Sequence, residues 1–150
     1  MVVAALVLVL GYAGYMWWQT KQAGQAVGDS VITTKSVPQD QLPSKFPEGI
    51  PIEKGAKTLV SLDQTSTDGR FQGTRKFVSA KSIEQNASIY EEFLTTDGWK
   101  IQSTTDQPTL KHFSARKGDL LLQIVLNEAK ITDGNTVEII VQQAEPAPGE

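Results

Sequence analysis

The spacing of apolar positions predicts one amphipathic helix, in the stretch from Ser82 to Trp99. At 100° per residue its apolar side chains fall on a single stripe, as expected for a helix that covers one face of a sheet. Burying the larger ones would contribute roughly 1.5–3 kcal/mol each. The stripe comprises Ile83, Ala87, Tyr90 and Leu94, with Phe93 at its edge.

This predicted helix carries its own start and stop signals. Ser82 followed by Gln85 forms a capping box, in which the hydroxyl accepts a backbone N–H and the amide reaches back. Gly98 stands where a left-handed residue ends a helix, and Trp99 after it can pack back on Leu94. We therefore expect the helix to begin and end within this stretch.

Alternating apolar and polar positions predict strands on both sides of the helix. The order β-β-α-β-β-β-β predicts an α+β domain, in which one helix covers an antiparallel sheet of about five or six strands. The segment 120–126 is apolar on both faces and is therefore expected inside the sheet. The predicted strands are 57–63, 71–80, 99–103, 110–116, 120–126 and 136–143.

A proline-containing segment, 46–56 (FPEGIPIEKGA), precedes the first predicted strand. Pro47 and Pro51 each fix φ and remove a hydrogen-bond donor, so the segment is extended and cannot lie inside a sheet. Phe46, Ile50 and Ile52 can hold it against the domain. We interpret it as a rigid strap at the start of the domain.

The N-terminal stretch predicts a transmembrane anchor. Residues 2–18 are apolar and uncharged and reach the lower limit of about 17–25 residues for a spanning helix. The aromatic residues at the end of this run resemble a membrane-interface belt. Two alternatives stay open: a cleaved signal peptide, with a small-residue site at Gly24-Gln25-Ala26, and a pilin-like helix. The interface residues are Tyr12, Tyr15, Trp17 and Trp18.

The chain thus divides into an anchor (1–18), a juxtamembrane linker rich in small and polar residues (19–45), an α+β domain (46–143) and a disordered tail (144–150). Lys21, the first charged residue, follows the anchor. Positive charge is expected on the cytoplasmic flank, but signal anchors ordinarily translocate a large C-terminal domain. We expect an extracytoplasmic domain on a single-pass cell-membrane protein.

Charge and composition exclude several function classes. The net charge of −3 belongs entirely to the chain from Lys21 onward, and such a domain lacks the clustered Lys and Arg of a nucleic-acid surface. The absence of cysteine excludes disulfides, thiolate metal sites, Cys nucleophiles and a lipidated N-terminal Cys. We therefore expect no nucleic-acid partner.

No residue pattern predicts catalysis. His112, the one histidine, alternates with Leu110 and Ser114 on a predicted strand, which is typical of one polar member of a sheet face. The loop 63–69 has oxygen ligands at alternate positions, but its glycine and its twelfth residue do not fit an EF-hand. Glu91 and Glu92 lie off the apolar stripe of the helix. We expect a non-enzymatic protein without cofactor or metal.

Two groups of residues are candidates for binding. A basic patch along the second predicted strand includes Lys81 and could face anionic headgroups or an acidic partner. An apolar pocket between the helix and a curved sheet would be lined by aromatic residues, although simple core packing also explains them. The contact-surface candidates are Arg70, Arg75, Lys76 and Phe77, and the pocket candidates are Tyr90, Trp99 and Phe113.

Two motifs support a family resemblance. They are P-x-G-I-P-I-x-x-G-A at 47–56 and Y-x-x-F-L-x-x-x-G-W at 90–99. With the N-terminal anchor, this combination resembles a group of functionally uncharacterised bacterial membrane-anchored envelope proteins. Glu53-Lys54 departs from the tyrosine-proline pair of that group, and Tyr90-Glu91 from its Tyr-Lys type pair. The resemblance implies a fold and a cell-surface setting, but no chemistry.

The leading functional hypothesis is a protein-interaction domain, as in an accessory subunit of a membrane complex. Its contact surface would be the uncovered sheet face or the edge strand beside the strap, by strand addition. The expected partners are the lipid bilayer and a membrane or envelope protein. One alternative is an envelope domain that binds a small ligand or lipid, and another is a pilin-like structural subunit.

Overall fold

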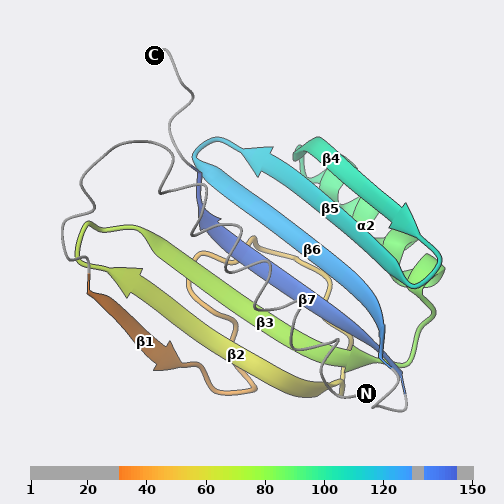
Figure 1. The fold of residues 1–150 in the computed structure, drawn as a ribbon, viewed down its shortest axis with the longest axis horizontal. Helices are drawn as coiled ribbons and strands as arrows, with labels where there is room; N and C mark the ends of the chain where they lie inside the picture. The colour runs from red at the N-terminus through yellow and green to blue at the C-terminus, as the bar shows by residue number, and fades with distance from the viewer. Residues whose placement is uncertain (1–30, 130–133, 145–150) are drawn as a thin grey trace. The chain divides into compact units, whose positions relative to one another are not determined.

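The computed structural model describes residues 31–129 and 134–144, which form one helix and seven strands. The strands make a single antiparallel sheet in the order β1-β2-β3-β7-β6-β5-β4, so β6 lies inside it (Figure 1). The α+β class is confirmed, and so is the one helix expected over the sheet, which is the single helix among the described residues. The elements are β1 (Ile32–Ser36), β2 (Lys57–Ser66), β3 (Phe71–Ser79), α2 (Ile83–Thr96), β4 (Lys100–Gln107), β5 (Leu110–Lys117), β6 (Leu120–Ala129) and β7 (Gly134–Gln143).

The sheet has seven strands instead of the expected five or six. The unexpected strand is β1, which lies in the stretch interpreted as a juxtamembrane linker (19–45). β1 pairs antiparallel with β2, from Ile32 opposite Ser66 to Ser36 opposite Leu62. All five of its side chains are exposed. A strand without a buried face shows no apolar alternation, so the periodicity that predicted the other strands could not reveal this one.

The helix α2 begins and ends as its capping signals predict. The Ser82 hydroxyl accepts from the Gln85 N–H at 3.1 Å, while the Gln85 amide oxygen accepts from the Ser82 N–H at 2.9 Å. Gly98 has a φ of +75°. The Trp99 N–H donates to the Leu94 carbonyl at 2.8 Å, which closes the C-terminal turn in the Schellman pattern.

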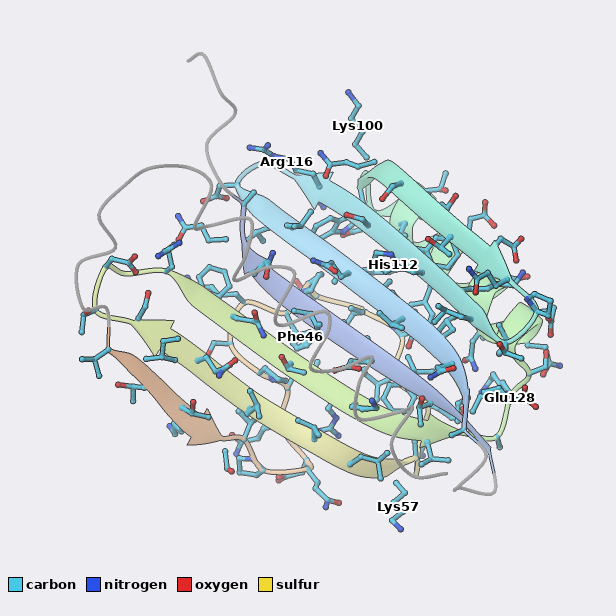
Figure 2. The ribbon with its side chains drawn as sticks, viewed as in Figure 1. Phe46, Lys57, Lys100, His112, Arg116 and Glu128 are labelled. Atoms are coloured by element: carbon cyan, nitrogen blue, oxygen red, sulfur yellow. The ribbon has the colours of Figure 1, made fainter. Side chains whose placement is uncertain are left out.

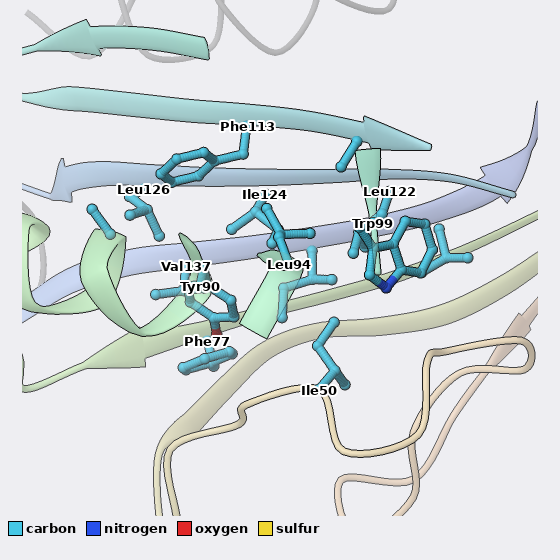
Figure 3. Packing of buried hydrophobic residues seen from close by; sticks show 14 of the residues in the cluster. Ile50, Phe77, Tyr90, Leu94, Trp99, Phe113, Leu122, Ile124, Leu126 and Val137 are labelled. Carbon is cyan, nitrogen blue, oxygen red and sulfur yellow. The ribbon is translucent and has the colours of Figure 1, made fainter. Parts of the chain in front are cut away.

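Both segments that cover the sheet lie on the same face. In Figure 1, α2 and the loops between β1 and β2 all lie behind the strands. The buried side chains between these layers form one apolar core, shown in Figure 3. The fully buried members include Phe77, Tyr90, Leu94, Leu122, Ile124, Leu126, Val137, Ile139 and Val141.

The proline-containing strap 46–56 packs on this core, as predicted. Ile50 is buried, and Phe46 and Ile52 pack against the cluster as partly buried side chains. The Tyr90 hydroxyl donates to the Pro51 carbonyl at 2.7 Å, so helix and strap are joined by a hydrogen bond as well as by apolar contact.

The predicted anchor (1–18), its interface aromatics and most of the predicted C-terminal tail lie outside the described residues. Within the described part of the chain, no helix has both the length and the apolar character needed to span a bilayer.

Candidate functional site

No described helix or loop covers the face of the sheet opposite α2. We call it the open face; side chains reach it from alternate positions of the strands β2 to β7, in the registers that the sheet defines. Figure 2 shows it toward the viewer. Its half-buried aliphatic side chains include Val60, Leu62, Leu110, Leu121, Val125 and Ile140.

Polar side chains stand between these aliphatic ones. Gln64, Gln72 and Gln142 are consecutive members of one row across β2, β3 and β7. The Gln72 side-chain amide donates at 3.3 Å to Gln64 Oε1 and also at 3.3 Å to Thr74 Oγ1. In a parallel row, Lys76 of β3 and Glu138 of β7 form an ion pair at 3.1 Å. The open face therefore combines apolar contact area with hydrogen-bonding groups.

His112 also lies on the open face, between Thr105 of β4 and Val125 of β6. Its Nε2 atom is buried, and the described residues offer it no hydrogen-bond partner. Burial lowers the pKa of His112 below its ordinary value, while a hydrogen bond with the Gln123 side chain opposes that shift. The imidazole is thus favoured in its neutral form, which is the form that packs on an apolar surface.

A second polar cluster joins the strap to the β3–α2 connection. Glu53 accepts from the Ser79 hydroxyl at 2.5 Å and from the Ala80 N–H at 3.2 Å, and it pairs with Lys81 at 3.3 Å. Asn86 of α2 donates to the same Ser79 hydroxyl at 3.0 Å. The hydrogen bond from Ser79 is the main cause that lowers the pKa of Glu53. Ser79 is completely buried, so this cluster anchors the strap and offers no exposed nucleophile.

A hollow of about 200 Å³, open to solvent, lies beside this cluster. Its lining comes from the strap and from the ends of β2 and β3 and includes Lys54 and Lys57. A second hollow lies on the solvent side of α2, around Glu91 and Glu92. In the ranges 31–129 and 134–144, no three His, Cys, Asp or Glu side chains gather where they could hold a metal ion.

Two of the four predicted contact residues are not on the surface. Arg75 is 5% exposed and Phe77 is 1% exposed, because both point toward the covered face of the sheet. The Arg75 guanidinium donates to the carbonyls of Gln39 at 2.7 Å and Gln41 at 3.4 Å, so it holds the loop after β1. The prediction that Arg75 and Phe77 form a contact surface is therefore wrong.

The other two predicted contact residues lie far apart and are both paired. Lys76 lies on the open face in its ion pair with Glu138. Arg70 lies at the turn between β2 and β3, where it pairs with Asp68 at 2.7 Å. Hydrogen bonds from Arg70 and Ser66 lower the pKa of Asp68 to about 2. Arg70 and Lys76 are close in the sequence, but in the structure they do not belong to one patch.

The three predicted pocket residues lie together, but as part of the filled core. Tyr90, Trp99 and Phe113 are 2%, 6% and 8% exposed, and Figure 3 shows them packed among Leu94, Ile124 and their neighbours. Burial and the negative charge of Glu53 raise the pKa of Tyr90. The Trp99 indole N–H donates to Asp97 at 2.9 Å, at the rim of the core.

One pair of residues on the open face has no counterpart among the predicted sites. Lys100 of β4 and Arg116 of β5 are directly opposite each other in the antiparallel register. Strand alternation marks both as polar positions, but only the register between the two strands brings them together. No local signal in the sequence could have predicted this juxtaposition.

Comparison with known proteins assigns the family. Residues 59–143, more than half of the chain, match the family model described as START domain-like. The match begins in β2 and ends at the last residue of β7, so it includes α2 and six of the seven strands. This chain belongs to the START domain-like family. No curated protein and no solved structure matches it.

Proposed function

We propose that this chain is a non-enzymatic, membrane-tethered protein whose folded domain binds a protein partner through the open face. The observation that carries the proposal is that, of the described residues, the segments that cover the sheet, α2 and the strap, both lie on one face. The other face leaves aliphatic side chains such as Val125 and Ile140 half-buried among amides and hydroxyls. Such a mixture of apolar area and hydrogen-bonding groups is typical of protein interfaces.

The tether is the apolar run 2–18, with its aromatic end, and the domain is extracytoplasmic in this proposal. The resemblance of the strap and helix motifs to bacterial envelope proteins supports that setting. A domain held at a membrane and offering a broad surface fits an accessory subunit of a membrane complex, with the partner an envelope or membrane protein.

Purification of the full-length protein in mild detergent from its native membrane, with mass spectrometry of what is retained, tests the proposal. The variant Val125→Lys/Ile140→Lys introduces two charges on the open face and should reduce partner recovery at least about tenfold. Leu42→Lys is the matched control, since Leu42 is an exposed aliphatic residue on the covering loop. A partner retained equally by all variants would overturn the assignment to this face.

A second candidate function is the binding of a small apolar ligand between α2 and the sheet. The family match favours it, because a START domain-like chain is compatible with a ligand-binding domain. Tyr90, Trp99 and Phe113 would have to move apart, since they are buried there. A lipid or metabolite that binds the native state would raise the melting temperature in a saturable way. A panel that produces no such shift would count against this candidate.

A further inference from the structure

The opposed cations Lys100 and Arg116 are an arrangement that a sheet ordinarily avoids. Like charges directly opposite in an antiparallel pair destabilise it, and these two residues are register partners across β4 and β5. Neither forms an ion pair within the described residues; Arg116 donates through Nε to the Gly118 carbonyl at 3.0 Å. Figure 2 shows both side chains at the same end of the sheet.

The polypeptide enters the domain at this same end. One row of register partners runs across the whole sheet, from Thr34 of β1 to Arg116 and Lys100. Beyond it lie Val31 and Ile32, where the described chain starts. These two aliphatic side chains are 63% and 62% exposed, more than any other large apolar residue described. We call this the entry end.

The other charges at the entry end are nearly balanced. Arg70 pairs with Asp68, and Lys117 pairs with Asp97 at 3.0 Å. The one other described acid there is Asp119, in the turn between β5 and β6. Among the described residues, Lys100 and Arg116 are thus the two cations at this end that make no ion pair. Lys100 on β4 stands six strand spacings, about 29 Å, from β1 and its exposed aliphatic pair, and Arg116 on β5 stands five, about 24 Å.

We infer that the entry end of the domain rests on a bilayer surface containing anionic lipids, with Lys100 and Arg116 bound to headgroup phosphate. Arg binds phosphate oxygens through two parallel N–H bonds, and an adjacent Lys adds a point charge. An anion between the two cations removes their mutual repulsion. Val31 and Ile32 supply the apolar contact that surface-bound segments make at the headgroup boundary.

This inference rests on the proposed anchoring, because the anchor is what would hold the entry end close to a bilayer. Twelve residues, 19–30, separate the apolar run from Val31. Fully extended, they span at most about 40 Å, so an anchored chain keeps the entry end near the bilayer. A lipid surface accounts for the exposed aliphatic pair as well as the cations, whereas an acidic protein accounts only for the cations.

The test uses the full-length chain in nanodiscs of neutral phosphatidylcholine, with or without phosphatidylglycerol. Because the chain has no cysteine, one can be introduced and labelled at the entry end (Thr67→Cys) or at the opposite end (Thr109→Cys). Quenching by lipids that carry a headgroup nitroxide should be stronger at position 67 than at 109, and stronger still with the anionic lipid. High salt should weaken the anionic-lipid effect.

The charge-reversed variant Lys100→Glu/Arg116→Glu should lose the increase in quenching that the anionic lipid causes. The matched control is Lys54→Glu/Lys57→Glu, two exposed lysines at the opposite end, which should keep it. Equal quenching at both ends, or quenching unaffected by the first variant, would overturn the inference while leaving the anchoring intact.

Sedimentation of the full-length chain with preformed vesicles distinguishes a failure of the proposed anchoring from a failure of the proposed surface contact. A chain that sediments only with anionic vesicles, and not after reversal of Lys100 and Arg116, supports the surface contact even if residues 2–18 do not insert. A chain that sediments with neither vesicle overturns both the anchoring and the contact. Recovery of an acidic protein that depends on this pair, without any lipid effect, would assign the pair to a protein contact instead.

Discussion

The carboxylate of Glu53 illustrates how single residues hold this domain together. It accepts hydrogen bonds from Ser79 and Ala80 and pairs with Lys81, so one side chain joins the strap to the start of α2. A buried donor such as the Ser79 hydroxyl is costly to leave without a partner. The strap is therefore fastened at this end by a charge-assisted cluster as well as by apolar packing.

Replacing this carboxylate should make the free energy of unfolding depend less on pH in the acidic range. Glu53→Gln should lower the free energy of unfolding by about 1–3 kcal/mol at pH 7. The pKa of Glu53 is lowered in the folded state from 4.5, so its contribution is complete above that value and is lost as the pH falls through the folded pKa. Urea denaturation from pH 7 to pH 3 should show the two proteins converging.

The control for this measurement is Glu48→Gln, which changes an exposed carboxylate on the same strap. It should leave the free energy of unfolding within about 0.5 kcal/mol of the unmodified protein. A difference between Glu53→Gln and the unmodified protein that stays constant down to pH 3 would contradict the linkage of Glu53 to acid stability.

At the scale of elements, α2 depends on its N-terminal cap. Ser82→Ala removes the hydroxyl that accepts from Gln85 and should cost about 1 kcal/mol of stability. Ser88→Ala is the same substitution on the exposed face of the same helix, where the serine hydroxyl donates to the Glu84 carbonyl. That change should be neutral or slightly stabilising, because alanine is the better helix former. Equal melting temperatures for the two variants would show that the cap contributes nothing.

The two edge strands bear on how a partner could bind. β1 is only five residues long, and the register of β4 shifts between Ile101 and Ser103 in a bulge-like irregularity. Short edge strands and bulges are features that oppose pairing with another chain. We therefore place the proposed protein contact on the open face and not on an edge strand; the sequence analysis had offered the edge strand beside the strap as the alternative.

At the scale of the whole domain, the layer between α2 and the sheet is a filled core. Leu94 is completely buried at its centre, so Leu94→Ala should cost about 2–5 kcal/mol through lost transfer free energy and the cavity left behind. Leu42→Ala, at a side chain that is 43% exposed, should cost less than about 0.5 kcal/mol. Chemical denaturation of the three proteins measures both. A small loss of unfolding free energy for Leu94→Ala would indicate that the layer is loosely packed, which would favour ligand binding between α2 and the sheet.

The features of this domain that rest on local signals could be predicted without the fold. The capping box and the glycine stop predicted α2 to within a few residues, because the groups that satisfy a helix end lie within one turn of it. The prolines predicted the strap, since they fix φ and cannot pair in a sheet. Alternation, together with the continuous apolar run 120–126, predicted the six strands β2 to β7.

Which residues from separate strands meet depends on the pairing of strands that are distant in the sequence. β3 pairs with β7 across about sixty residues, so no local pattern shows that Lys76 faces Glu138 or that Arg75 turns toward a loop. β1 has no buried face and forms solely by pairing with β2. The opposition of Lys100 and Arg116 likewise comes from the register of two strands. Register is a non-local property, and it determines which side chains are neighbours on the open face and at the entry end.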